Sequence, residues 1–193
     1  MSAEPVIALV SSVGGLDALT RVLQSLPAEL PASVVALQHS DPSRVSQLAA
    51  LLDRVGTLPV ADARDGEALV MGRAFVAPSG SHILITGSRT VALVKSGKPP
   101  PHRPSADLLL VSLAVAVGPA AIAVVLTGLG HDGAAGVAAI KRLGGTLLAS
   151  TAATSQESSM PEAAIDTGLV DHVLPLDRIG PALVQLCATA FEP

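Results

Sequence analysis

Apolar strands followed by helices recur along this chain, and this alternation constrains the fold more than any other feature. The run from Val6 to Val10 is apolar throughout and leads through Gly14-Gly15 into a segment with apolar residues at helical spacing. The same order begins again at Ser33 and near Ala120. Strands that are apolar on both faces and alternate with helices indicate a parallel sheet covered on both sides. We therefore expect an α/β fold, doubly wound and mostly parallel.

The same spacing predicts further elements. Helices are expected from about Pro42 to Val55 and from Asp132 to Leu143, and another strand from Thr146 to Ala149. Residues 58–95 differ, because short apolar runs alternate there with turn pairs such as Asp65-Gly66. These runs predict short strands and hairpins that form an antiparallel extension of the sheet.

One long apolar segment, from Leu108 to Leu126, carries no charged residue and approaches the length of a membrane-spanning helix. It contains Gly118-Pro119, however, and proline cannot continue a helix, whereas glycine favours the position just past a helix end. The segment therefore predicts a buried helix followed by a buried strand, and no membrane insertion. Ser105 is the expected N-cap of that helix, which should start near Ala106.

Composition narrows the class of protein. The chain of 193 residues has no internal repeat or long linker, so residues 1–193 are expected to form one domain. It has no Tyr or Trp and only two Phe, a net charge of −4 and scattered basic residues, which argues against binding nucleic acid. Cys187 fits a small buried hydrophobe, and the first residues show no basic region followed by an apolar core, so secretion is not expected. We therefore expect a cytoplasmic protein.

Three residues suited to acyl transfer fall at the predicted strand ends. Ser12 follows the first strand, His39 follows the second, and Asp132 follows the strand that begins near Ala120. In a parallel sheet the carboxyl ends of the strands form the ligand-binding edge. A hydroxyl, an imidazole that takes its proton and a carboxylate that orients the imidazole together make a hydrolytic triad. The sequence therefore predicts a serine hydrolase site.

Each of these residues also fits a structural role. A serine or aspartate at such a position can cap a helix, and a histidine there can be a hydrogen-bonded residue of the sheet edge. Spacing alone does not choose between Ser11 and Ser12 as the nucleophile. Gly14 and Gly15 suit close approach of a substrate carbonyl, and the backbone N–H groups that open the next helix could face an oxyanion.

Other chemistries are less well supported. The remaining histidines show no metal-ligand spacing, so no metal site is expected, and no G-x-S-x-G elbow surrounds Ser12 as in lipase-like hydrolases. Gly128, Gly130 and Gly133 form a G-x-G-x-x-G pattern typical of dinucleotide binding. The acidic residue expected about 20 positions later is missing, because the strand at 146–149 ends in Ser150-Thr151.

Several segments together resemble the catalytic domain of the chemotaxis protein-glutamate methylesterases (CheB type). V-S-S-V-G-G at residues 10–15 matches the family's nucleophile segment with Ser12 in register, Gln38-His39 matches its Q-H pair, and the segment 127–136 matches its aspartate segment with Asp132 in register. Other matches are D-G-E, F-V-A-P, H-R-P-S-A-D at 102–107, M-P-E-A-A-I at 160–165 and V-L-P-L at 173–176. The resemblance covers essentially the whole chain.

The resemblance implies hydrolysis of glutamate γ-methyl esters on the cytoplasmic helices of chemoreceptors, with release of methanol and glutamine deamidation as a second activity. It implies no cofactor. It places backbone oxyanion donors at Val13 and Leu129. The segments that it matches supply the substrate-site candidates, which are Gly14, Gly15, Gly128, Gly130, His102, Arg103 and Met160.

Family members commonly carry an N-terminal receiver domain that regulates access to the site. Here the first strand begins about five residues from Met1, so we expect either a receiver-free member or a fragment, with a separate response-regulator receiver protein as a partner to consider. Val13 and Leu129 replace the family's Thr and Met, Ser40 replaces an apolar residue, and residues 155–159 are more polar than usual. A binding or signalling module with weakened catalysis is therefore the alternative interpretation.

Overall fold

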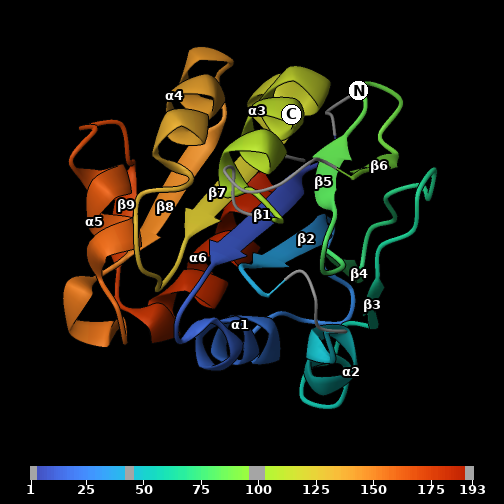
Figure 1. Ribbon diagram of the computed structural model, residues 1–193, viewed down its shortest axis with the longest axis horizontal. Coiled ribbons are helices and arrows are strands. Elements are labelled where there is room, and N and C mark those ends of the chain that lie inside the picture. Colours follow the sequence, from blue (N-terminus) through green and yellow to red (C-terminus); the bar gives the residue numbers. More distant parts are fainter. Residues whose placement is uncertain (1–3, 42–45, 96–102, 190–193) are drawn as a thin grey trace.

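The computed structural model describes residues 4–41, 46–95 and 103–189, and a seven-stranded sheet forms its centre (Figure 1). The strand order is β3-β4-β2-β1-β7-β8-β9, and every neighbouring pair is parallel. The strands are β1 Val6–Ser11, β2 Ser33–Gln38, β3 Val60–Asp62, β4 Arg73–Val76, β7 Ala121–Val125, β8 Thr146–Ser150 and β9 His172–Leu174. The expected parallel α/β fold is confirmed.

Helices cover both faces of this sheet (Figure 1). One face packs against α1 Gly15–Gln24, α2 Leu48–Asp53 and α6 Leu176–Thr189. The other packs against α3 Ala106–Val117, α4 Ala134–Arg142 and α5 Ser159–Ile165, together with the hairpin of β5 His82–Ile85 and β6 Val91–Val94. Two short 3₁₀ turns, η1 Gly118–Ala120 and η2 Ala152–Thr154, precede β7 and follow β8.

The two covered faces explain why the central strands are apolar throughout. In β1, Ile7 and Leu9 enter the core beneath α1, whereas Val6, Ala8 and Val10 enter the core beneath α3. All five side chains are fully buried. Because a buried Leu, Ile or Val side chain contributes roughly 1.5–3 kcal/mol, a polar residue at any of these positions would be costly.

The segment 58–95 contains the expected antiparallel hairpin, but only in its second half. β5 and β6 pair antiparallel as a separate two-stranded sheet that packs against α3, where Ile85 N donates to Ser112 Oγ at 3.1 Å. The first half, expected to be antiparallel too, instead adds β3 and β4 in parallel to the main sheet beside β2. Runs of three or four residues carry too little pattern to reveal strand direction, which long-range pairing decides.

The long apolar segment breaks where the sequence predicts. Helix α3 ends at Val117, Gly118 adopts a positive φ of 53°, and β7 begins at Ala121. Ser105 is the N-cap of α3, as expected, and its side chain accepts a hydrogen bond from Leu108 N. Among the described residues, no helix is long and apolar enough to cross a membrane.

Two helices are shorter than expected. The segment predicted as a helix from about Pro42 to Val55 contains α2 only at Leu48–Asp53, and residues 42–45 lie outside the described residues. The helix expected from Asp132 begins at Ala134, after Gly133 with a φ of 106°. Asp132 therefore does not cap its own helix, because its carboxylate is bonded elsewhere. Cys187 is buried on α6, as expected, and burial raises the pKa of its thiol to about 11.

The strand order creates a switch point at the centre of the sheet. From β1 the chain builds outward through β2 toward β4 and β3, and then returns to β7 on the other side of β1. Loops therefore diverge on either side of the carboxyl end of β1. In open α/β sheets this is where ligands bind.

Candidate active site

Backbone hydrogen bonds tie the carboxyl ends of the three central strands together. Ser12 follows β1, and its N–H donates to the carbonyl of Thr127, which follows β7, at 2.9 Å. His39 follows β2, and its N–H donates to the carbonyl of Ser11 at 3.0 Å. Ser12 and His39 are therefore held at the same edge of the sheet by the ladder itself.

The side chains of His39 and Asp132 meet at this edge. His39 Nε2 and Asp132 Oδ2 are 2.8 Å apart, and each side chain is only 9% exposed. His39 comes from the loop after β2 and Asp132 from the loop after β7, and β1 lies between these two strands. The bond thus joins the loops on either side of the strand that presents Ser12.

Asp132 is bonded on both carboxylate oxygens. Besides His39, Oδ2 accepts from Ala106 N at 2.8 Å, and Oδ1 accepts from Asp107 N at 3.0 Å and Ser105 Oγ at 3.2 Å. Burial alone would raise the pKa of Asp132, but the hydrogen bonds from His39 and from the two backbone amides outweigh it and hold the pKa well below its usual range. The carboxylate is therefore ionised and fixed in orientation.

The choice between the two serines follows from their surroundings. Ser11 is fully buried, and its Oγ donates to the carbonyl of Leu37 at 3.1 Å. Ser12 is partly exposed at the strand end. A nucleophile must reach a substrate carbonyl, so Ser12 is the serine that the fold presents.

Two backbone N–H groups near Ser12 remain available for an oxyanion. Three neighbouring amides are occupied, because Ser12 N donates to Thr127 O, Gly128 N to Glu157 O at 2.8 Å, and Gly130 N to Ser159 Oγ at 3.1 Å. Within the described part of the chain, no hydrogen bond uses the N–H of Val13 or Leu129. Both residues are exposed, as an oxyanion donor at a cleft must be.

The glycines around Ser12 have different surroundings. A Cβ on Gly128 would lie 2.7 Å from both Ser12 Cβ and Met160 Sδ, so Gly128 and the buried Met160 form the packing behind Ser12. Gly14 adopts a φ of 78°. Gly15 is buried against Ser11, whereas a Cβ on Gly130 would meet no atom within 4 Å.

Of the two candidates from the H-R-P-S segment, His102 lies outside the described residues. Arg103 is described and acts electrostatically on His82, which the sequence interpretation did not single out for the site. His82 is buried on β5; burial, followed by the charge of Arg103, lowers its pKa, while Asp132 acts in the opposite direction. The sequence carried no signal for His82, since only the packing of the hairpin on α3 brings it here.

Asp107 is a second residue that sequence reasoning missed as part of the site. Its Oδ1 accepts from Gly133 N at 2.9 Å and from Gly136 N at 2.7 Å, at the start of α4. In a dinucleotide-binding protein those N–H groups would face the pyrophosphate. The Asp107 carboxylate occupies that position, so the glycine pattern at 128–133 does not support dinucleotide binding. The signal that could have pointed to Asp107 is its place at the end of the H-R-P-S-A-D segment.

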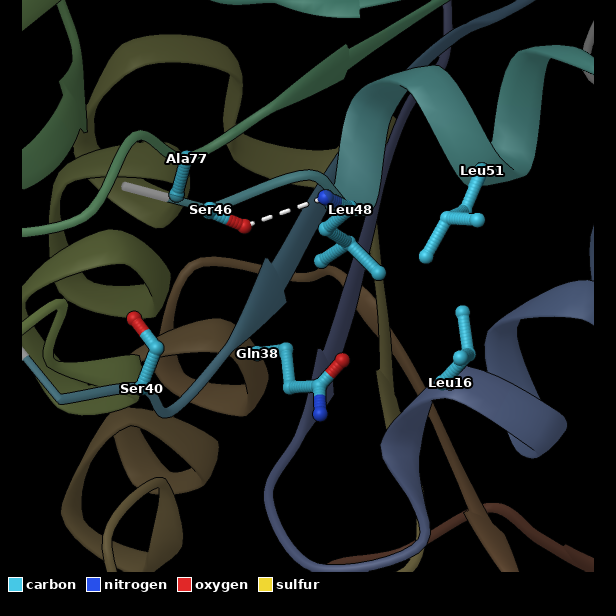
Figure 2. Close-up of a pocket in the computed structure, with 7 residues that line it drawn as sticks. All are labelled: Leu16, Gln38, Ser40, Ser46, Leu48, Leu51 and Ala77. Carbon is cyan, nitrogen blue, oxygen red and sulfur yellow. Dashed lines mark hydrogen bonds between the residues drawn. The ribbon is translucent and has the colours of Figure 1, made fainter. Parts of the chain in front are cut away.

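A pocket of about 200 Å³ lies near the carboxyl end of β2 (Figure 2). Gln38 and Ser40, the neighbours of His39 in the chain, line it together with leucines of α1 and α2; the full set is Leu16, Gln38, Ser40, Ser46, Leu48, Leu51 and Ala77. Figure 2 shows the Gln38 amide lying between the Ser40 hydroxyl and the leucine side chains. Among the described residues, no group of three or more His, Cys, Asp or Glu is arranged to hold a metal ion.

The fold and this edge together define a class of protein. It is a parallel, doubly wound α/β protein with a serine, a histidine and a carboxylate at the switch point of its sheet. Comparison with known proteins then identifies the family. The family model described as CheB methylesterase matches residues 7–183. The chain belongs to the CheB methylesterase family.

Individual relatives agree with this assignment. A protein of Pseudomonas aeruginosa named protein-glutamate methylesterase/protein-glutamine glutaminase 2 is 41% identical over 191 residues, which is 97% of this chain and 54% of the relative. A protein of Pyrococcus horikoshii named protein-glutamate methylesterase/protein-glutamine glutaminase is 36% identical over 182 residues, 93% of this chain and 50% of the relative. The chain thus spans about half the length of these curated relatives.

A solved structure matches this chain over nearly the full length of both. The crystal structure of the Thermotoga maritima CheB methylesterase catalytic domain superposes with a TM-score of 0.90 at 34% identity, covering 95% of this chain and 99% of that one. The part shared with the longer relatives is therefore of the same fold as the catalytic domain in that structure.

Proposed function

We propose that residues 1–193 constitute one methylesterase catalytic domain, which hydrolyses glutamate γ-methyl esters on chemoreceptors by a Ser-His-Asp mechanism. The observation that carries the proposal is the 2.8 Å hydrogen bond between His39 and Asp132 beside the presented Ser12. Membership of the CheB methylesterase family supplies the ester class. The partners that fit this function are the methylated cytoplasmic helices of chemoreceptors and, for regulation, a separate receiver protein, so the protein would act in the cytoplasm.

In the proposed mechanism Ser12 Oγ attacks the ester carbonyl and gives its proton to His39. Because Nε2 of His39 is bonded to Asp132, the proton passes to Nδ1. The ionised Asp132 stabilises the imidazolium, and the N–H groups of Val13 and Leu129 stabilise the negative carbonyl oxygen. Collapse of the intermediate breaks the bond to methoxide, which takes the proton from His39 and leaves as methanol.

The second half of the reaction regenerates the enzyme. Water gives a proton to His39 and attacks the acyl-Ser12 ester, and Ser12 leaves with that proton to release glutamate. The same steps on a glutamine side chain would release ammonia, and the names of the relatives include a glutaminase activity. We therefore propose glutamine deamidation as a second reaction of the same site.

Methanol release from a methylated chemoreceptor fragment tests the proposal. The parental chain should release methanol, and Ser12→Ala should abolish the release because it removes the attacking oxygen. Ser11→Ala is the matched control and should retain activity once folded, since Ser11 is buried against Leu37. A Ser12→Ala protein that works at the parental rate would exclude this mechanism.

A binding or signalling module without catalysis is the alternative. An active-site serine phosphonate separates the two, because it reacts covalently only with an activated hydroxyl. Labelling of the parental chain that is lost in Ser12→Ala supports an enzyme. A folded chain that neither reacts with the phosphonate nor releases methanol would support the binding module.

A further inference from the structure

Asp107 and Asp132 exchange hydrogen bonds across the start of two helices. Asp132 accepts from the N–H groups of Ala106 and Asp107 at the beginning of α3. In return, Asp107 accepts from the N–H groups of Gly133 and Gly136 at the beginning of α4. Each carboxylate thereby satisfies donors of the other's helix, which a helix end leaves unpaired.

The exchange fixes the loop that carries Asp132. Gly133, the first residue after Asp132, is held by Asp107 Oδ1 at 2.9 Å, and Gly136, one helical turn later, is held by the same oxygen at 2.7 Å. The helices also pack closely, since a Cβ on Gly136 would lie 2.6 Å from Leu110 Cβ of α3. The direction from which Asp132 reaches His39 therefore depends on where Asp107 holds the start of α4.

Asp107 performs this task at an electrostatic cost. Burial raises its pKa, and the neighbouring Asp132 raises it further, although the hydrogen bonds from Gly136 and Gly133 act in the opposite direction. Two carboxylates share one partly buried site. A neutral acceptor in the same place would make the same two bonds to Gly133 and Gly136 without the repulsion, so the useful property of Asp107 is the position of its oxygen.

We propose that Asp107 is a positioning residue, which holds the start of α4 so that Asp132 meets His39 in the orientation that turnover needs. This inference rests on the proposed function for its kinetic part. Nothing in it requires Asp107 to contact the substrate. It follows that loss of the acceptor oxygen should lower kcat and leave KM nearly unchanged, because a misplacement of about 1 Å in a catalytic group can cost up to about a hundredfold in rate.

Three substitutions separate position from charge. Asp107→Ala removes the acceptor and should lower kcat about tenfold to a hundredfold with KM within about twofold. Asp107→Asn keeps an acceptor oxygen in place and should stay within about threefold of the parental kcat. Asp107→Glu keeps the charge but moves the oxygens by one methylene, and should fall with the alanine variant.

Asp171→Ala is the matched control. Asp171 also joins two elements through a backbone amide, accepting from Leu147 N at 2.8 Å and from Lys141 Nζ at 2.7 Å, but it lies at the amino ends of the strands. Its loss should lower the melting temperature and leave kcat unchanged. If Asp107→Ala has a melting temperature similar to that of Asp171→Ala but a lower kcat, its loss of kcat comes from lost positioning and not from lost stability.

A readout independent of the substrate is the low-field proton NMR signal of the His39 ring N–H bonded to Asp132. It should be present in the parental chain and in Asp107→Asn, and shifted or lost in folded Asp107→Glu and Asp107→Ala, with slower phosphonate labelling of Ser12. These readouts hold even if receptor esters prove to be the wrong substrate, so the two proposals can fail separately. A parental signal and labelling rate in folded Asp107→Glu and Asp107→Ala, or an inactive Asp107→Asn beside an active Asp107→Glu, would overturn the positioning role.

Discussion

Asp132 accepts four hydrogen bonds, one from His39 and three from Ser105, Ala106 and Asp107 at the start of α3. A carboxylate, which has no donor group, can accept all four of these bonds. A backbone N–H donates to each of the two carboxylate oxygens, Ala106 N to Oδ2 and Asp107 N to Oδ1. An amide group at this position would turn a donor toward one of them.

Asp132→Asn should therefore leave the fold intact but lower turnover by roughly a thousandfold or more. Whichever way the amide lies, its NH₂ group opposes a backbone N–H, and we expect a loss of about 1–3 kcal/mol in unfolding free energy. Methanol release and chemical denaturation measure the two effects. A variant with parental turnover would show that His39 does not need the carboxylate.

Gly128→Ala should impair activity more than stability. The added Cβ would lie 2.7 Å from Ser12 Cβ and from Met160 Sδ, and Met160 can shift only by pressing on the buried core. Ser12 should therefore move away from His39, with a loss of turnover of about tenfold or more. Gly87→Ala is the control, because no atom lies within 4 Å of its Cβ position. Equal turnover in the two variants would contradict the close packing of Gly128 against Ser12.

At the scale of elements, polar side chains connect neighbouring elements at both edges of the sheet. At the carboxyl edge, Asp107 and Asp132 join α3 to α4. At the amino edge, Asp171 joins α4 to the beginning of β8 through Lys141 and Leu147 N. These bonds fix element ends that the apolar cores alone would leave free to slide, because hydrophobic burial is not directional.

Asp171 gives a pH-dependent test of this role. Burial would raise its pKa, but Lys141, the N–H of Leu147 and the nearby His172 outweigh burial and lower it. A group with a depressed folded-state pKa stabilises the protein above its unfolded value of about 4 and loses this effect as the pH falls through the folded value. Asp171→Ala should thus cost about 1–2 kcal/mol at pH 7 and clearly less near pH 2–3.

Urea denaturation of the parental chain and Asp171→Ala at several pH values provides the measurement. The difference between the two curves should shrink steadily below pH 4. A difference that stays constant down to the acid limit would mean that the charge of Asp171 contributes nothing and that only its packing matters.

At the scale of the whole molecule, every residue proposed for the chemistry lies within this chain, and the central strands bring them together. The loops after β1, β2 and β7 supply Ser12, His39 and Asp132 around one switch point. The mechanism that we propose therefore uses only groups of this chain.

The purified 193-residue chain should accordingly hydrolyse its substrate without a phosphodonor. Ser12 is partly exposed, and Val13 and Leu129 lie exposed at the same edge. Turnover should be the same with and without a small-molecule phosphodonor such as acetyl phosphate. If activity appeared only after a separate phosphorylated receiver protein was added, the site would not be competent as it stands in this chain.

The sequence by itself determined the class of fold and the positions of the candidate triad in the chain. Apolar runs such as Val6–Val10 predict strands buried on both faces, because no amphipathic alternative fits them. The end of the helix at Gly118-Pro119 could also be predicted from the sequence, because glycine and proline act through their own backbone geometry. Ser12, His39 and Asp132 could be found because strand ends are where a parallel sheet places its chemistry.

Tertiary structure alone decided which of these elements are neighbours. The parallel pairing of β3 and β4 depends on contact with β2, and the three or four residues of each strand do not encode a direction. Likewise, Asp132 appears from sequence to start its own helix, but in the structure it binds the start of α3 while Asp107 binds the start of α4. Such exchanges join residues about 25 positions apart in the chain, and local propensity cannot encode them because each carboxylate could as well have capped its own helix.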